Sequence, residues 1–571
     1  MKQLILTCGK FKLPVFCIMI MTGFTACSSS SQVPGLPVIP NDDKALPAAI
    51  LTGTYYVDAE NGDDNHSGLS VSTAWKTLEH INKQTFGAGA QVLFKAGQNW
   101  YGSLQPSGSG EAGRPVTIGR YGEGPQPAIH GQGVANAVHL KNTAYLVLRD
   151  LEITNYAASE ENGISLEEWE SRNVTDWFQA INPPQLISGN SPKTGVRITA
   201  TDLGEVNQIH LINLHVHGVN GAINQNDEKT KNNGGIFIEI TGSRVPTCFN
   251  GLLIENCRIH DVDRTGLSNV SSWDKRTLAT NENWTPSLNI VIRNNVFERA
   301  GANALIVRVA KNPLMEHNLF HQNGIKGSGN AAFNFNTDGA VWQFNESRFT
   351  KKNRNDADAG GIDSDYRTKN TIIQYNYLHG NDFGMLVTGG PENYGGFNDR
   401  TIVRYNIFER EGLTERDGES KYAFKVGGNA TNTFVHNNVF YLSPFQEDVH
   451  MIYHKDWGGN PENTCYYNNI FYLDGSNHGY SLGNSAGNHF FNNLCYGNAT
   501  INWPVSENPV YEDPLFLKVG NGPDGYQINA VSPAINRGTV FPEPGAPASD
   551  YFGNPLPVDG PVDLGVHQLK R

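Results

Sequence analysis

Short runs of alternating apolar and polar residues recur along most of this chain, and each run leads into an asparagine followed by another apolar pair. Examples are Ile292-Arg-Asn-Asn-Val-Phe297 and Val435-His-Asn-Asn-Val-Phe440. Val, Ile, Phe and Tyr dominate the runs, and Gly or Asn bounds them, which is typical of β-strands. The repeated region carries no clear stripe of apolar residues at helical spacing. The pattern therefore predicts a series of short strands.

The asparagines of these runs return at intervals of roughly 24 to 32 residues, which is the range of solenoid repeats. The series is Asn318, Asn345, Asn376, Asn406, Asn438, Asn469 and Asn493. Asparagine suits a sharp bend between strands, and amides stacked on successive coils can hydrogen-bond along the stack. We expect these residues to form a structural ladder and to have no part in an active site.

The repeat resembles the right-handed parallel β-helix of the pectate-lyase-like superfamily over nearly all of the chain that follows the first fifty residues. Further segments similar to such proteins are Thr54–Gly68, Thr73–Leu78, Asp513–Phe516, Ser532–Asn536 and Asp550–Asn554. The resemblance implies an all-β fold, a right-handed parallel β-helix with a short N-terminal capping helix that turns Leu78 and Ile81 inward. It leaves the reaction open, because this fold carries lyases, hydrolases and adhesins.

The first residues are typical of a bacterial lipoprotein signal. Three lysines precede the apolar run Leu13–Met21, which is shorter than the roughly 20 residues of a membrane span, and small residues lead to Cys27. We expect residues 1–26 to be a signal peptide, Cys27 to carry the lipid, 27–52 to be a flexible tether, and 53–571 to form one β-helix domain. The implied location is the outer membrane, facing the periplasm or the cell surface, with the lipid as the only membrane contact.

The bulk properties narrow the class of partner. The formal net charge of −13 argues against nucleic acid. Cys248, Cys257, Cys465 and Cys495 match no zinc spacing, and we expect Cys257 and Cys495 to pack in the core. A solenoid grows by adding coils, so 571 residues are compatible with one long domain. We expect a monomer that binds a polysaccharide or oligosaccharide.

A second strand precedes each asparagine run, and its alternate side chains are expected to point outward together. Most of these strands begin with a small residue, which sets the alignment between repeats. The alignment places Asn334, Asp363 and Lys425 in one outward column and Arg308, Asn336, Asp365, Thr388 and His454 in the other. Coils stack about 4.8 Å apart, so the sequence predicts a polar cluster in the middle of the solenoid, with Asn334, Asn336, Thr388 and His454 binding substrate.

Asp363 and Asp365 are the candidate catalytic pair. Their Cα atoms are expected about 6.6 Å apart on one face of a strand. Two carboxyl groups this close should split their pKa values, which is what a general acid and a general base require. The first hypothesis is therefore a glycoside hydrolase that needs no cofactor.

The same residues are compatible with a polysaccharide lyase. In that hypothesis Lys425 or Arg308 abstracts a proton beside a uronate carboxylate, and calcium is held with the help of Asp356 and Asp358. A third hypothesis is a glycan-binding or adhesin solenoid without activity. It is disfavoured because the repeats of adhesins tend to be uniform, whereas one stretch of this repeat differs from the others.

Two long interruptions of the repeat carry tryptophans. Residues 154–193 contain Trp169, and residues 268–286 contain Trp273. Loops of this length are usually functional, and aromatic faces stack on sugar rings, so we expect Trp169 and Trp273 to bind substrate. The alternative is that they close their loops onto the solenoid.

Overall fold

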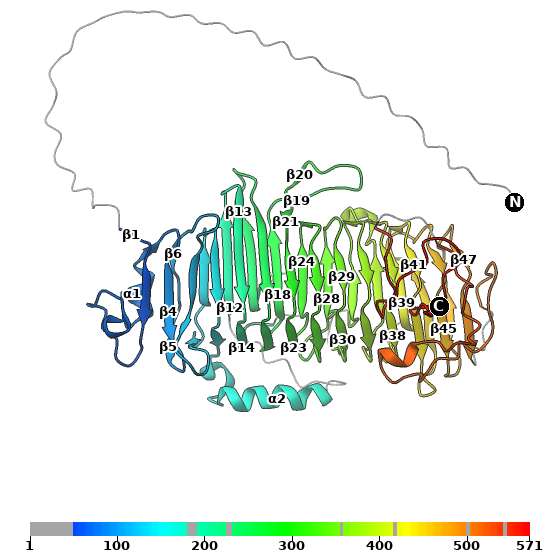
Figure 1. The fold of residues 1–571 in the computed structure, drawn as a ribbon, viewed down its shortest axis with the longest axis horizontal. Coiled ribbons are helices and arrows are strands. Elements are labelled where there is room, and N and C mark those ends of the chain that lie inside the picture. The colour runs from blue at the N-terminus through cyan, green and yellow to red at the C-terminus, as the bar shows by residue number, and fades with distance from the viewer. Residues whose placement is uncertain are drawn as a thin grey trace, which may run out of the picture. The chain divides into compact units, whose positions relative to one another are not determined.

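The computed structural model describes residues 49–179, 191–223, 231–353, 358–414, 420–497, 503–540 and 545–570, without the side chains of 176–179. These residues form a right-handed parallel β-helix, in which each coil adds one strand to each of three long parallel sheets (Figure 1). No helix in the described ranges is long and apolar enough to cross a membrane.

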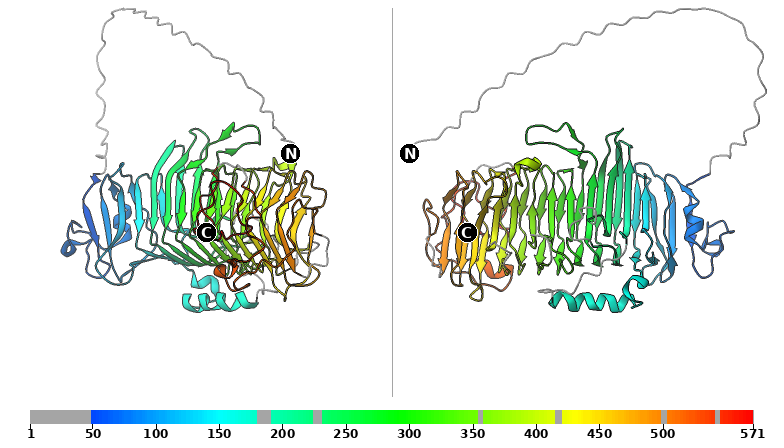
Figure 2. Two further views of the ribbon diagram at one scale, coloured as in Figure 1. Left: turned by 45° about the vertical axis from the view of Figure 1, so that its right-hand side comes forward. Right: turned by 180° about the vertical axis from the view of Figure 1, so that it is seen from behind.

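The three sheets run the length of the solenoid, as two further views show (Figure 2). Sheet I consists of β2 (Thr54–Val57), β4 (Gln91–Lys95), β7 (Val116–Tyr121), β10 (Leu146–Arg149), β13 (Glu205–Ile212), β16 (Cys248–Glu255), β22 (Val291–Arg293), β26 (Leu314–Glu316), β29 (Val341–Gln343), β33 (Ile372–Gln374), β37 (Ile402–Arg404), β41 (Phe434–His436), β44 (Cys465–Tyr467) and β47 (His489–Phe491), with β21 (Ser287–Leu288) and β25 (Ala310–Lys311) beside this path. Sheet II consists of β5 (Asn99–Tyr101), β8 (Ala128–His130), β11 (Glu152–Asn155), β14 (His215–Val219), β17 (Arg258–Val262), β23 (Val296–Ala300), β27 (Leu319–His321), β30 (Glu346–Arg348), β34 (Tyr377–His379), β38 (Ile407–Glu409), β42 (Val439–Leu442), β45 (Ile470–Leu473) and β48 (Leu494–Gly497). Sheet III consists of β9 (Asn136–Lys141), β12 (Thr194–Thr201), β15 (Gly234–Thr241), β18 (Thr265–Ser271), β24 (Leu305–Arg308), β28 (Ala332–Phe335), β31 (Ile362–Ser364), β35 (Met385–Thr388), β39 (Lys421–Gly427), β43 (Val449–Lys455) and β46 (Gly479–Ser481).

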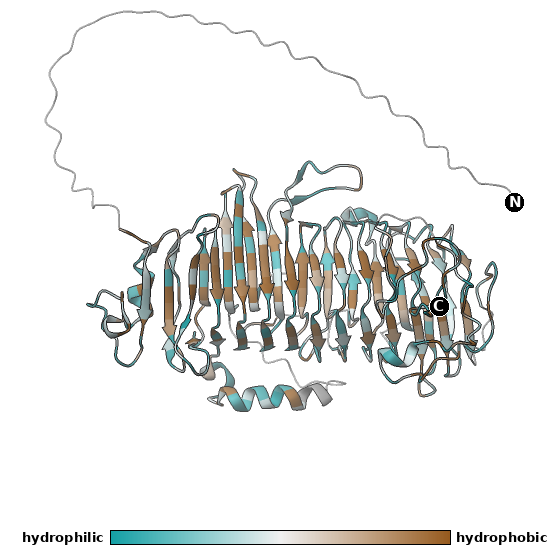
Figure 3. Ribbon diagram, viewed as in Figure 1, coloured by the Kyte–Doolittle hydropathy of each residue, from teal (hydrophilic) through white to brown (hydrophobic). Residues whose placement is uncertain are grey.

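The core is a set of apolar stacks that follow the register from coil to coil. In sheet I, one stack runs through Ile292, Met315, Trp342, Ile373, Val403, Val435, Tyr466 and Phe490, all of them buried. Apolar and polar bands alternate along the strands of Figure 3 because successive side chains point to opposite faces. The alternation in the sequence thus sets which residues enter the core.

The predicted asparagine ladder is confirmed at the bend between sheets I and II. Each ladder amide donates from Nδ2 to Oδ1 of the next asparagine at 2.9 to 3.1 Å, from Asn295 through to Asn493. The left-handed backbone, however, falls on the preceding residue, such as Tyr375 or Tyr405. The ladder asparagines therefore serve as buried hydrogen-bonding groups, and their neighbours make the turn.

The segments before and after the repeat pack against the solenoid. Helix α1 (Leu78–Asn82) buries Leu78 and Ile81 at the first coils, as predicted, and Thr77 caps it by accepting from the backbone N–H of His80. The C-terminal segment lies on the outer face of sheet II, where Tyr526 donates to Glu409 at 3.0 Å. The C-terminal segment thereby covers an apolar part of the outer face of sheet II.

The two interruptions of the repeat fold as separate insertions. Residues after β11 form the 3₁₀ turn η2 (Ala158–Glu161) and helix α2 (Leu166–Gln179), which lies along the outer side of sheet II (Figure 1). The second insertion is a hairpin of β19 (Asp274–Lys275) and β20 (Asn283–Trp284). Buried free cysteines Cys257 and Cys495 pack in the core, as expected.

Candidate functional site

A cavity of about 540 Å³ lies on sheet III in the middle of the solenoid. Strands β24, β28, β31, β35 and β39 contribute its floor, and the β19–β20 hairpin and the turn after β43 contribute its sides. Its carboxylates are Asp274, Asp358, Asp363, Asp365 and Asp456, and its basic residues are Lys231, Arg308, Lys425 and Lys455. Most of the residues that the sequence placed in the polar cluster therefore line this cavity.

Asp363 is on β31 and Asp365 directly follows the last residue of that strand, so the two side chains lie on the same face, at the cavity floor. Asp363 pairs with Phe333 on one neighbouring coil and with Leu386 on the other. Lys425 pairs with Leu386, two coils from Asp363. This is the separation that the sequence predicted for the acid and the lysine.

One hydroxyl group contacts both carboxylates. Thr388 Oγ1 lies 3.0 Å from Asp365 Oδ1 and 3.4 Å from Asp363 Oδ1. A hydroxyl has a single hydrogen to donate, and the shorter contact gives it to Asp365. The contact with Asp363 is then favourable when Asp363 carries a proton and donates it to Thr388.

The remaining hydrogen bonds also differ between the two carboxyl groups. The Asn330 amide donates to Asp363 Oδ2 at 3.0 Å, and Asn330 is held in turn by the backbone N–H of Gly360 at 2.8 Å. Asp365 Oδ1 accepts from the backbone N–H of Tyr366 at 2.8 Å. Asp365 Oδ1 thus receives two donors, whereas Asp363 Oδ1 has only the longer contact with Thr388 among the hydrogen bonds described here, and a proton on this oxygen would serve as the donor.

The electrostatics agree with this assignment. Burial is the main cause that raises the pKa of Asp363 well above its ordinary value, and the charges of Asp365 and Asp358 raise it further. Burial also raises the pKa of Asp365, to about 6, against hydrogen bonds from Tyr366 and Thr388 that lower it. At neutral pH the pair is expected to hold one proton, on Asp363.

Arg308 and Lys425 reach the same cavity from opposite sides of the pair. The Arg308 guanidinium lies 5.9 Å from the ring centre of Phe333, and the Lys425 ammonium lies 5.4 Å from that of Tyr422. Their positive charges lower the pKa values of Asp365 and Asp363, respectively. They are therefore placed to stabilise negative charge beside the carboxylates.

The predicted positions of Asn334, Asn336 and His454 were wrong. Asn334 pairs with Ser364, so it points into the core, where it bonds to Thr337 and accepts from Trp342 Nε1 at 2.8 Å. The neighbouring residues Ala331 and Ala332 both fit the small position of the repeat, and alignment on Ala332 shifted the strand by one residue. Such a shift exchanges the two faces.

Asn336 is displaced by the same shift, and His454 by a separate one-residue shift on β43. Asn336 takes a left-handed turn position at the end of β28 and donates to the carbonyl of Asp274. His454 pairs with Val426 and turns inward, where its Nε2 lies 2.7 Å from the buried hydroxyl of Tyr466. Thr388 keeps its predicted outward position, and Lys455 takes the place that had been given to His454.

The two tryptophans named from the sequence are not among the residues that line the cavity. Trp169 is 3% exposed on α2, with the Lys326 ammonium 4.3 Å from its ring centre. Trp273 packs against the core beside the hairpin. The loop-closing alternative describes both of them, because each anchors an insertion onto the solenoid.

Aromatic residues from the repeat line the cavity instead. Phe333 and Phe335 take the outward positions of β28, and Tyr366 and Trp457 stand at its side. The Tyr366 ring contacts Phe335 at 4.8 Å and Trp457 at 6.0 Å, both edge to face. In the sequence, Trp457 belongs to the Lys455-Asp-Trp457 turn. The residues of this turn do not themselves indicate that it lies beside the coils that form the cavity.

Two predicted groups fall outside the described residues, namely Asp356 and Cys27. Asp358 is described and lines the cavity, close enough to raise the pKa of Asp363. Among the described histidine, cysteine and acidic residues, the groups close enough to hold a metal ion together lie on sheet II and on helix α2 beside it, outside this cavity.

Comparisons with known proteins identify related chains. No protein-family model matches the sequence. Lacto-N-biosidase from Bifidobacterium longum subsp. longum is 26% identical in an alignment that covers 90% of this chain and 36% of that protein. The chain therefore spans about a third of the length of this curated relative.

Solved structures show the same fold. The GH136 lacto-N-biosidase from Eubacterium ramulus superposes with a TM-score of 0.52 at 22% identity, over 74% of this chain and 68% of that one. Its selenomethionine derivative gives a TM-score of 0.50 at 19% identity, over 81% and 68%. These similarities support the β-helix fold.

Proposed function

We propose that this protein is a glycoside hydrolase that acts on an oligosaccharide or polysaccharide bound in the sheet III cavity. The observation that carries the proposal is the Thr388 hydroxyl shared by Asp363 and Asp365. This contact supports a protonated Asp363 beside an ionised Asp365 on the floor of a cavity of about 540 Å³. The relative's name, lacto-N-biosidase, supports hydrolysis of a glycosidic bond as the reaction class.

In this mechanism Asp363 is the general acid, because its raised pKa keeps a proton for the departing oxygen. Asp365 is the ionised partner, which stabilises or attacks the anomeric carbon. Both carboxylates contact one hydroxyl at 3.0 and 3.4 Å, so their nearest oxygens lie closer than the roughly 6.5 to 9.5 Å typical of inverting enzymes. The geometry favours retention of anomeric configuration.

Arg308 and Lys425 have a supporting role in the mechanism. Their charges lie beside Asp365 and Asp363 and stabilise the ionised forms that appear during the reaction. Trp457, which is 45% exposed at the side of the cavity, offers an apolar face for a sugar ring. The lining therefore combines proton transfer with stacking, as sugar hydrolysis requires.

The lyase hypothesis requires Lys425 to lose its proton and calcium to bind the carboxylates. A carboxyl group that holds a proton at neutral pH, as Asp363 is expected to do, is a poor calcium ligand. The hydrolase is therefore the better-supported function, and calcium dependence is the discriminating observation.

The decisive experiment compares Asp363→Asn, Asp365→Asn and Asp358→Asn on a panel of glycans, with reducing ends and unsaturated-uronate absorbance measured separately. We expect reducing ends without absorbance, a rate loss of about 10²- to 10⁴-fold in the first two variants, and no effect of chelator. Product analysis by NMR should show retained configuration.

Alternative outcomes reassign the roles. A large loss in Asp358→Asn together with full activity in Asp363→Asn would move the acid to Asp358. Absorbance from unsaturated products, inactivation by chelator and a dead Lys425→Ala variant would establish the lyase. Full activity in all three Asn variants would place the site elsewhere.

We also propose that Cys27 is lipidated and that residues 27–52 tether the β-helix to the outer membrane. Support comes from the lysine-rich, apolar and small-residue pattern that precedes this cysteine.

A further inference from the structure

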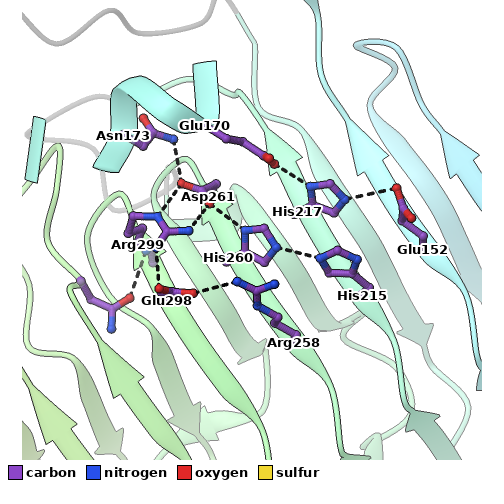
Figure 4. A network of polar contacts seen from close by, with 12 residues as sticks. Glu152, Glu170, Asn173, His215, His217, Arg258, His260, Asp261, Glu298 and Arg299 are labelled. Atoms are coloured by element: carbon purple, nitrogen blue, oxygen red, sulfur yellow. Dashed lines mark hydrogen bonds and ion pairs between the residues drawn. The ribbon is translucent and has the colours of Figure 1, made fainter. Parts of the chain in front are cut away.

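Three histidines cluster on the outer face of sheet II, beneath α2 and outside the cavity described above (Figure 4). His215 and His217 are on β14, and His260 is in register with His217 on the next coil, β17. One ring nitrogen of each lies within 4.8 Å of the other two, and the Nε2 atoms of His215 and His260 are 2.7 Å apart. Parallel stacking of coils therefore brings three imidazoles to one point.

Carboxylates orient two of the three rings. Asp261 Oδ2 lies 2.7 Å from His260 Nδ1, and Glu170 Oε1 of α2 lies 2.5 Å from His217 Nδ1. A carboxylate on Nδ1 fixes the hydrogen there and leaves Nε2 as the coordinating atom, which is the arrangement around metal-bound histidines. Figure 4 shows both carboxylates on the Nδ1 sides of their rings.

The orienting carboxylate of His260 is itself held rigidly. Asp261 is buried and accepts from Arg299 at 3.0 and 2.7 Å and from the Asn173 amide of α2 at 3.2 Å. A surface histidine that serves only solubility needs no such support. The cluster is thus a constructed arrangement that joins two coils and a helix.

The charges around the cluster attract a cation. Glu152 Oε1 lies 3.4 Å from His217 Nε2, on the side opposite Glu170. With Asp261 on His260, three carboxylates therefore contact the rings of the cluster.

We propose that His215, His217 and His260 bind one divalent transition-metal ion of the zinc class, with Glu152 as the fourth ligand. Imidazole nitrogen suits zinc, whereas calcium and magnesium prefer oxygen. The His217 ring lies at 16° and 17° to the planes of His215 and His260. Side-chain rotation must therefore accompany binding, to aim the three nitrogens at one ion.

The consequence is a cross-link. The ion would join β14 to β17 and, through Glu170, fix α2 on sheet II. Its role in this position is structural, because the cluster is on a different sheet from Asp363 and Asp365. The proposal does not depend on the reaction at sheet III.

The test uses the full mature chain without an affinity tag, treated with chelator, dialysed and titrated with Zn²⁺ by calorimetry. We expect one equivalent to bind, Co²⁺ to give the visible absorption of a low-symmetry nitrogen site, and Ca²⁺ not to bind. His215→Gln and His260→Gln should each abolish binding, and Asp261→Asn should weaken it by about 10- to 100-fold. Zn²⁺ should also raise the melting temperature of wild type.

His321→Gln is the matched control, because His321 lies in the same outward column of sheet II, two coils from His260. It should bind Zn²⁺ as wild type does. Glu152→Gln supplies a second, milder ligand variant if a histidine variant fails to fold. The proposal is overturned if wild type takes up no Zn²⁺, or if binding survives in the folded His215→Gln, His260→Gln and Glu152→Gln variants.

Discussion

Replacement of Asn406 by alanine tests the asparagine ladder as the source of order between coils. Asn406 is fully buried and its Oδ1 accepts from both the backbone N–H and the Nδ2 of Asn376 at 2.9 Å. Its own Nδ2 donates to the carbonyls of Ile373 and Arg404 and to Asn438 Oδ1. The substitution removes all five contacts at once.

The loss in free energy of unfolding depends on which buried groups are left with no hydrogen-bond partner. The Asn376 side chain keeps its bonds to the carbonyls of Trp342 and Gln374, and Asn438 Oδ1 still accepts from the backbone of residue 406. The Asn376 backbone N–H is left without an acceptor, which costs about 1 to 3 kcal/mol, and the lost packing adds to it. We expect a total of about 2 to 4 kcal/mol.

The assay is thermal unfolding followed by circular dichroism. For a domain of this size, the entropy of unfolding is about 1 kcal/mol per kelvin, so the melting temperature should fall by about 2 to 4 °C. Asn99→Ala is the control, because Asn99 is exposed on β5 and surface substitutions stay within about 0.5 kcal/mol. An unchanged melting temperature in Asn406→Ala, or a loss of activity without a loss of stability, would refute the structural role of the ladder.

Two further outcomes are expected. The pKa of Asp365 is raised from 3.8 to about 6, so its contribution to stability is present at low pH and is lost as the pH rises through that window. The Asp365→Asn variant should therefore melt at a higher temperature than wild type at pH 7.5, and the difference should shrink toward pH 4. A difference that stays constant with pH would contradict the raised pKa. Cys27→Ala should release the protein from the membrane fraction or leave its signal uncleaved, as judged by fractionation and mass spectrometry, and unchanged membrane association with cleavage at another residue would contradict lipidation.

The sequence by itself determined the repeat, its β character and the ladder. Alternation of apolar residues needs only the two-residue period of a strand to assign faces, and the recurrence of Asn376, Asn406 and Asn438 at one place in each repeat requires stacked coils. The same local logic placed Asp363 and Asp365 on one face, because residues two apart on a strand always share it. The sequence is sufficient for these features because they follow from the order of residues within a strand and from the recurrence of one residue type along the chain.

Only the tertiary structure decided the register between coils and the surroundings of the site. Ala331 and Ala332 fit the repeat equally well in the sequence, and the burial of Asn334 against Trp342 selects one of them. The Thr388 hydroxyl, the Asn330 amide and the Trp457 ring reach the carboxyl pair from separate coils or turns.

The histidine cluster was beyond the sequence for the same reason. His215 and His260 are separated by a whole coil, and Glu170 arrives from an inserted helix. Nothing local to these residues encodes their meeting, since it depends on how many residues each coil contains and on where α2 docks. Periodicity fixes which face a side chain takes, whereas the partners it meets there are fixed by coil length and by the packing of the insertions.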